Sequence, residues 1–148
     1  MFRALTKLLS KSEIPKEPFV DQALGEFTFD RDLGWKKQIL LAGKEVDLVL
    51  GYDGKPPSEQ MLQTAKSWID GWPSQLPRIV EYIRRELRAW RDKPNQPVPE
   101  RFEVDSINIL WRDEPNASMI YFHYPGDDIR LWHVTFYGFD PNGFACDD

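Results

Sequence analysis

The sequence predicts a single α+β domain, in which an antiparallel sheet with the order β-β-β-α-α-β-β-β packs one face on a pair of helices. Its 148 residues are the usual size of one domain. A hydrophobic fraction of 41%, with 20 aromatic residues, is enough to build a packed core. Runs with a two-residue period lie on both sides of a central stretch with a helical period. These three observations predict the fold class.

Residues 1–18 are expected to form a short amphipathic helix and a linker. The helix is indicated over residues 2–11 by apolar side chains at helical spacing: Phe2, Leu5, Leu8 and Leu9. Pro15 and Pro18 then favour an extended connector, because each proline biases its predecessor away from helix. The domain proper is expected to cover residues 19–148.

Three strands are predicted between Leu24 and Tyr52. Phe27 and Phe29 alternate in the first run, and Ile39 and Leu41 end the second. The third run alternates at Val46, Leu48 and Leu50. Gly34 and Ala42-Gly43 supply the turns, which predicts a three-stranded meander.

Two helices are predicted after this meander. Ser58 is placed to cap the first, which Gly71-Trp72-Pro73 should end. The apolar faces of the two helices are Met61, Leu62, Ala65, Trp68 and Ile69, and then Leu76, Ile79, Val80, Ile83, Leu87 and Trp90. Residues 93–99 contain three prolines and are expected to form a surface loop.

Three more strands are predicted at residues 102–111, 119–124 and 129–137, with two turns between them. In the last two runs both alternating sets of side chains are largely apolar. One face of the sheet can pack on the helices. The other needs a second cover, which could be the N-terminal helix, the first meander or a partner.

Charge is unevenly distributed along the chain. The formal net charge is −5, which disfavours nucleic acid as a partner because phosphates need surplus Lys and Arg. Residues 99–148 carry three Lys and Arg against ten Asp and Glu, together with half of the aromatic residues. An acidic, aromatic-rich surface is therefore expected in this part of the chain, suited to a basic protein partner.

The compartment expected from the sequence is the cytoplasm. Cys146 has no second cysteine with which to form a disulfide, and a position near the chain end favours an inert thiol. The N-terminal apolar runs are too short for a signal peptide or a membrane span. No phosphate loop, nucleophile elbow, HExxH or CxxC motif is present, so no cofactor is predicted.

His123, His133 and Asp127 are the catalytic candidates. A turn near Gly126 would bring the two histidines close together on one face of adjacent strands. Two imidazoles and a carboxylate can hold zinc or iron, or act as an acid/base pair. The favoured alternative is that the same histidines are ordinary cross-strand partners in an aromatic-rich sheet, because packing roles outnumber catalytic ones. The residues expected to contact a partner are Trp132, Tyr121, Tyr124, Asp127 and Asp128.

The second predicted helix carries five of the ten arginines: Arg78, Arg84, Arg85, Arg88 and Arg91. They could form an anion or partner site. Glu81 and Glu86 are spaced to pair with neighbouring arginines, so a solvated face of internal ion pairs is the alternative.

Two segments resemble a known family. Residues 23–35, Ala-Leu-Gly-Glu-Phe-Thr-Phe-Asp-Arg-Asp-Leu-Gly-Trp, are similar to the opening of the bacterial "domain of unknown function 2262" family. Residues 126–136 follow its Gly-Asp-hydrophobic-aromatic-Trp-Gly-His pattern, although no glycine separates Trp132 from His133. The resemblance covers about residues 20–143 and implies a bacterial source and the strand–helix–strand order. It implies no activity, and it places any shared role on Gly126, Asp127, Trp132 and His133.

Three functional hypotheses follow from the sequence. The first is a non-catalytic protein-binding module, in one form an immunity-type protein that neutralises a basic toxin. The second is a metal-dependent or acid/base hydrolase that uses His123, His133 and Asp127. The third is a domain that forms a homo-oligomer through the second face of its sheet.

Overall fold

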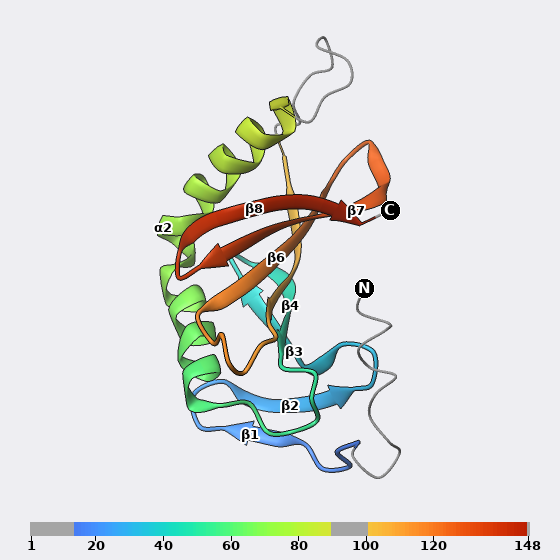
Figure 1. Ribbon diagram of the computed structural model, residues 1–148, viewed down its shortest axis with the longest axis vertical. Coiled ribbons are helices and arrows are strands. Elements are labelled where there is room, and N and C mark those ends of the chain that lie inside the picture. Colours follow the sequence, from blue (N-terminus) through green and yellow to red (C-terminus); the bar gives the residue numbers. More distant parts are fainter. Residues whose placement is uncertain (1–13, 90–100, 148) are drawn as a thin grey trace.

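One long helix and an eight-stranded sheet make up the fold in the computed structural model, which describes residues 14–89 and 101–147 (Figure 1). The helix, α2, spans Glu59–Ala89. The strands are β1 (Phe19–Asp21), β2 (Gly25–Asp30), β3 (Gly34–Leu41), β4 (Lys44–Leu50), β5 (Glu103–Ile109), β6 (Ala117–Tyr124), β7 (Asp127–Tyr137) and β8 (Asp140–Asp147). The architecture is α+β, as the sequence predicts.

The strands lie in the sheet in the order of the chain, from β1 to β8. All neighbouring pairs are antiparallel except β4 and β5, which are parallel and are connected by α2. The described part of the chain is therefore a four-stranded meander, a crossover helix and a second four-stranded meander.

The predicted helix pair is wrong, because α2 continues through Gly71-Trp72-Pro73 without a break. Pro73 and Pro77 are both exposed, so water can reach the carbonyls of Ile69 and Pro73 that lose their amide donors. The apolar face continues beyond them, with Ile79, Ile83 and Leu87 buried. Burial of this face stabilises the helix across the two prolines.

The single helix also explains why β4 and β5 are parallel, which the sequence did not predict. Two helices of similar length would return the chain to the end of the sheet where the first helix begins. One helix of 31 residues instead carries the chain to the opposite end, at about 1.5 Å per residue, so β5 starts beside the start of β4. The prediction of a wholly antiparallel sheet is therefore wrong at this pair.

The predicted strands are confirmed as β2 to β7, and two further strands flank them. β1 has only three residues, and β8 begins with Asp140-Pro141-Asn142-Gly143, which has the composition of a turn. Residues 14–18 have no regular structure, in agreement with the proline-rich connector. The predicted N-terminal helix and the loop at residues 93–99 lie outside the described residues.

Two tight turns explain the geometry of the first meander. Ala42 and Gly43 both have positive φ, 52° and 78°, and close a two-residue hairpin between Leu41 and Lys44. Gly34 has a φ of 114°, and a Cβ atom there would lie 1.8 Å from the carbonyl oxygen of Gly51. Only glycine permits this close contact between the first residue of β3 and the residue that follows β4.

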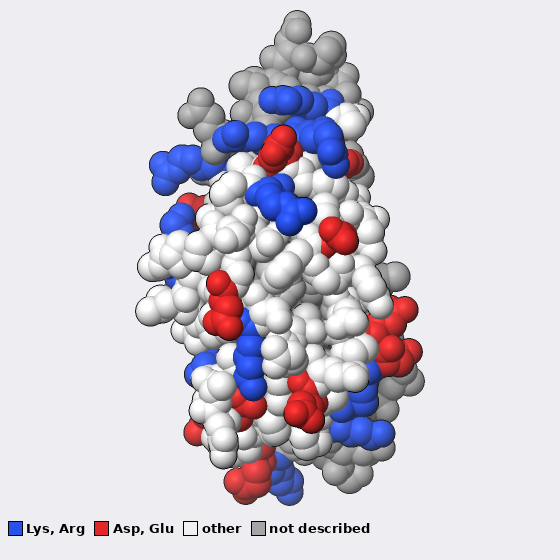
Figure 2. Space-filling view, turned by 90° about the vertical axis from the view of Figure 1, so that its left-hand side faces the viewer, with Lys and Arg blue, Asp and Glu red and all other residues white. Residues whose placement is uncertain are grey.

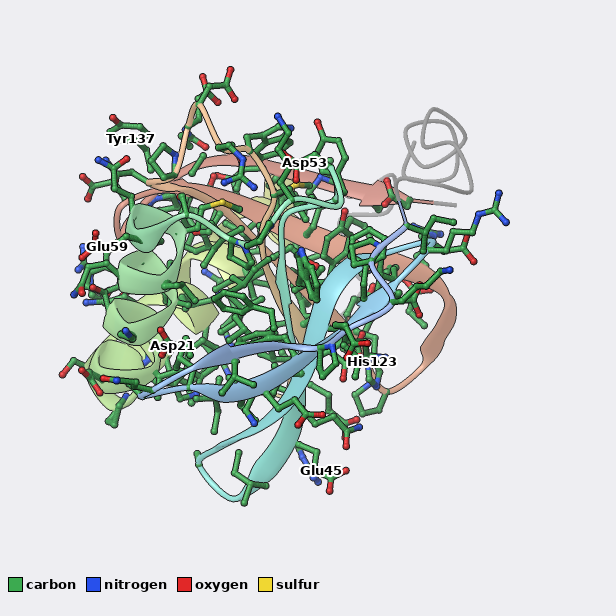
Figure 3. The ribbon with its side chains drawn as sticks, turned by 90° about the horizontal axis from the view of Figure 1, so that it is seen from below. Asp21, Glu45, Asp53, Glu59, His123 and Tyr137 are labelled. Atoms are coloured by element: carbon green, nitrogen blue, oxygen red, sulfur yellow. The ribbon has the colours of Figure 1, made fainter. Side chains whose placement is uncertain are left out.

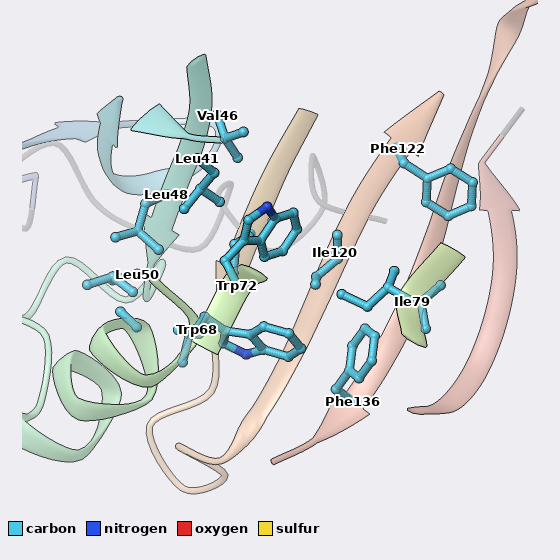
Figure 4. Close-up of a cluster of buried hydrophobic side chains, with 14 of the residues drawn as sticks. Leu41, Val46, Leu48, Leu50, Trp68, Trp72, Ile79, Ile120, Phe122 and Phe136 are labelled. Carbon is cyan, nitrogen blue, oxygen red and sulfur yellow. The ribbon is translucent and has the colours of Figure 1, made fainter. Parts of the chain in front are cut away.

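The core lies between α2 and one face of the sheet, which we call the covered face. Trp68 and Trp72 from the helix pack among alternate side chains of the strands, including Leu48, Ile120 and Phe136 (Figure 4). Trp68 is 1% exposed, and its Nε1–H donates to Ser118 Oγ at 3.0 Å. Helix α2 is too polar to cross a membrane, and the described residues contain no other helix that could.

The opposite face of the sheet, which we call the open face, has no helix of the described residues against it (Figure 1). The first meander does not cover it, because its strands extend the same sheet. Val49, Met119 and Tyr121 in the middle of this face are buried. The predicted N-terminal helix, the other proposed cover of this face, lies outside the described residues.

Candidate functional site

His123 lies on the open face between two carboxylates. Its Nδ1 atom is 2.9 Å from Asp105 Oδ2, and its Nε2 atom is 2.9 Å from Glu103 Oε2. Glu103 is directly opposite His123 in the β5–β6 pair. Figure 3 places His123 across the sheet from α2.

A β-bulge in β5 makes this arrangement possible. The register shifts between Val104 and Ser106, so Asp105 is an extra residue without a partner in β6. Asp105 forms a hydrogen bond with His123, and Ser106 accepts one from Asn108 Nδ2. Both side chains therefore lie on the open face. Without the bulge, alternation would turn one of them toward the core.

The two carboxylates stabilise the protonated form of His123. The hydrogen bond with Asp105 is the largest influence raising its pKa, and Glu103 raises it further, against the opposing effect of burial. A ring that donates from both nitrogens is an imidazolium, with no lone pair left to accept a proton or bind a metal. This geometry suits a charged recognition group better than a catalytic base.

The cluster belongs to a longer row of side chains, which we call the open-face row. It is defined by three pairs of directly opposed residues, to which Asp47 and Asp105 are added: Leu40 and Glu45, Glu103 and His123, and Leu131 and Asp147. Its members lie at one end of β3 to β8 and are Leu40, Glu45, Asp47, Glu103, Asp105, His123, Leu131 and Asp147.

The open-face row is acidic and partly apolar. It has five carboxylates. Lys36 Nζ is 3.2 Å from Asp47, and His123 adds a positive charge when it is protonated. Leu40 is 70% exposed and Leu131 is 37% exposed, both unusually high for leucine side chains within a sheet. The negative charge of the row suits a basic partner, and the exposed leucines offer apolar area that such a partner could bury.

His133 also belongs to the open face, directly opposite Tyr121. The two rings are 5.1 Å apart, and burial lowers the pKa of His133, opposed by the nearby Asp147 carboxylate. Its Nδ1 atom is buried and has no hydrogen-bond partner among the described residues. His123 and His133 therefore share a face, as predicted, but in opposite electrostatic environments.

Asp127 does not join the two histidines. Its Oδ2 atom accepts a hydrogen bond from Trp132 Nε1 at 3.1 Å, and Trp132 faces the core. Burial raises the pKa of Asp127, but hydrogen bonds from Trp132 and Tyr124 and the charge of Arg130 outweigh it and hold the pKa low. The structure thus does not bring together the three residues of the hydrolase hypothesis.

The aromatic residues expected to contact a partner are mostly internal. Trp132 is 2% exposed and stacks on Tyr124 and Phe144, and Tyr121 is buried as well. Asp127 holds the Trp132 indole, and the side chain of Asp128 lies outside the description. Trp132 and Tyr121 therefore present little surface to a partner.

The helix arginines form a separate basic area. Figure 2 shows Lys and Arg gathered at the C-terminal end of α2, on the face of the molecule opposite the open-face row. Arg85 lies 3.8 Å from Glu86 and over the ring of Tyr82, and Arg78 donates to Gln75 Oε1. Arg85–Glu86 is an ion pair of adjacent residues, and the other two contacts involve uncharged partners, so the expected pairing of Glu81 and Glu86 with arginines at helical spacing stays a prediction. Arg91 lies outside the described residues.

Sequence reasoning predicted an acidic surface from residues 99–148 but missed the part of the open-face row that β4 contributes, although a signal was present. Glu45 and Asp47 alternate with the buried Val46 and Leu48, which places both carboxylates on the face away from the core. The bulge that brings Asp105 to His123 has no comparable signal.

No three or more His, Cys, Asp or Glu side chains within residues 14–89 and 101–147 are arranged to hold a metal ion. Comparisons with models of known families, with curated proteins and with solved structures find no match. The resemblance to the "domain of unknown function 2262" family stays a prediction.

Proposed function

We propose that the chain is a protein-binding module that recognises a basic protein through the open-face row. The observation that carries the proposal is a row of carboxylates with two exposed leucines, on the face of the sheet that no helix of the described residues covers. Carboxylates attract a basic partner over long range, and exposed apolar side chains provide area to bury on contact.

The composition of the row supports a positively charged partner in particular. Lys36 pairs with Asp47, and His123 is shared between Glu103 and Asp105, so the five carboxylates of the row outnumber these two basic side chains. A partner that places Lys or Arg over Glu45 and Glu103 would balance this excess of negative charge. A toxin-neutralising protein is one form of such a module, since a toxin that acts on nucleic acid would need Lys and Arg to neutralise phosphates.

The test uses basic proteins encoded by the reading frames next to this gene. Each is co-expressed with the full chain and titrated by calorimetry with the wild type and with Glu45→Lys/Glu103→Lys. We expect one neighbour to bind saturably, with affinity at least about tenfold weaker for the variant and falling with added salt. Relief of that neighbour's toxicity would support the toxin-neutralising form.

The matched control is Glu59→Lys/Glu81→Lys, which reverses two exposed charges on the helix side of the molecule. The control variant should bind as the wild type does. If no neighbour binds, or if both double variants lose affinity equally, the open-face row is not the binding surface.

A further inference from the structure

A hollow of about 340 Å³ lies between the first half of α2 and two turns of the second meander. Helix α2 contributes Gln60 and Gln63, the turn before β6 contributes Asn116, and the β7–β8 turn contributes Phe139. Figure 1 shows the β7–β8 turn beside α2, on the side of the molecule away from the open-face row. We call this site the amide hollow.

Hydrogen bonds between separate elements fix the walls of the amide hollow. The hydroxyl of Thr64 on α2 lies 2.7 Å from the carbonyl oxygen of Pro115, and Gly138 N donates to Asn116 O at 2.9 Å. Below them, the Trp68 indole donates to Ser118. These links join the helix and both turns, so the hollow is formed before any ligand arrives.

No residue that lines the amide hollow is ionisable, although 29% of the chain is charged. Gln60, Gln63 and Asn116 are exposed, and each carboxamide offers one acceptor oxygen and two N–H donors. Figure 2 shows that the middle of this face is largely uncharged, in contrast to its basic end. The donors and acceptors therefore suit a neutral ligand with several hydroxyl groups.

Phe139 supplies an apolar wall. Its ring lies 4.8 Å from that of Trp68 in an edge-on arrangement, and a Cβ atom at Gly71 would be 3.1 Å from its Cζ atom. A glycine inside a helix costs about 1 kcal/mol relative to alanine, and the close approach of this ring explains its presence. The negative face of an aromatic ring attracts the C–H groups of a sugar ring.

We propose that the amide hollow binds a neutral saccharide, with one sugar unit between Phe139 and the carboxamides of Gln63 and Asn116. The size of the hollow is at the lower end for small-ligand sites, as one sugar unit requires. The site is distinct from the open-face row, so it does not depend on the proposed protein partner.

The test is an NMR titration of the full ¹⁵N-labelled chain with four probes in turn: the methyl glycosides of glucose, galactose and mannose, and N-acetylglucosamine. At least one should shift the side-chain amide signals of Gln60, Gln63 and Asn116 saturably, together with the backbone amide of Gly138. Gln63→Ala and Asn116→Ala should each weaken binding at least about fivefold, as expected for one lost hydrogen bond of about 1 kcal/mol.

Gln38→Ala is the matched control, since Gln38 is an exposed amide residue of β3 far from the hollow in the sheet. It should leave the affinity unchanged, and the three variants should keep the wild-type unfolding transition because all three side chains are exposed. The proposal is overturned if none of the four sugars shifts these signals saturably, or if both hollow variants bind as tightly as the wild type.

Discussion

The covered and open faces of the sheet are built from the same strands but differ in what they contribute. On β4, Val46 and Leu48 pack under α2, while Glu45 and Asp47 alternate with them on the other side. On β6, Phe122 is buried in the core, while the next residue, His123, joins two carboxylates on the open face. Stability is thus concentrated on the covered face and charge on the open one.

This separation changes the meaning of the acidic, aromatic-rich C-terminal third. Along the chain, acidic and aromatic residues coincide, which predicts one surface that carries both. In the fold they divide by strand alternation, so that Trp132 and Phe136 are buried while Glu103 and Asp105 are accessible. The exposed apolar groups beside the carboxylates are leucines, Leu40 and Leu131, rather than aromatic residues.

The largest difference between the faces should appear in the free energy of unfolding. Trp68→Ala removes a fully buried indole that contacts Trp72, Phe136 and Phe139, and should cost about 3–5 kcal/mol. Leu40→Ala, on the open face, should change stability by less than about 0.5 kcal/mol. Urea denaturation measures both. Similar losses in the two variants would mean that Leu40 is covered and that the face is not open.

A smaller effect is expected at the boundary of the covered face, where Asp127 holds the Trp132 indole. Asp127→Ala leaves this buried N–H without its acceptor and should cost about 1–3 kcal/mol. Asp113→Ala is the control, since Asp113 is exposed in a turn and should have almost no effect. The same denaturation experiment distinguishes them. Equal stability of the two variants would contradict a structural role for Asp127.

The smallest effects concern the two histidines of the open face, which should give pH dependences of opposite sign. The folded pKa of His123 is raised above 6.5, so its contribution is complete below pH 6.5 and is lost as pH rises through the folded pKa. The folded pKa of His133 is lowered by burial, so its neutral ring costs stability as pH falls below 6.5.

The direction of each pH dependence can be determined from the free energy of unfolding, measured at about pH 5 and at about pH 8. His123→Gln should lose more stability at the lower pH, by less than about 1 kcal/mol because the ion pairs are partly exposed. His133→Gln should gain stability relative to the wild type at the lower pH. The same sign for both variants would show that the environments of the two rings are not as described.

Local patterns predicted most of the fold. Alternation located β2 to β7, and Ser58 caps α2 as expected, with its Oγ accepting from Met61 N at 3.2 Å. The error at Pro73 arose because local rules assign a helix end to proline, whereas burial of Ile79 and Ile83 beyond it outweighs the lost hydrogen bond. Strand β8 was missed because only Phe144 and Cys146 mark its core-facing side.

The candidate site was predicted only in part. Alternation and the position of the turn placed His123 and His133 close together on one face. The shared face agrees with the structure, but His133 lies opposite Tyr121 and not opposite His123. The two partners of His123, Glu103 and Asp105, both come from β5, and the sequence did not define the register of this strand against β6. Asp105 is also the extra residue of the bulge in β5. The bulge in β5 sets which side chains of this strand reach His123, and local patterns carry no signal for it.

The most direct test of the open-face row is carboxyl labelling of the chain by a carbodiimide, read by mass spectrometry, with and without the basic protein that calorimetry identifies. The predicted result is protection of Glu45 and Glu103 on binding, while Glu59 and Glu81 on the helix side react as in the free chain. Protection of Glu59 and Glu81 instead, with unchanged labelling at Glu45 and Glu103, would contradict the assignment of the partner to the open face.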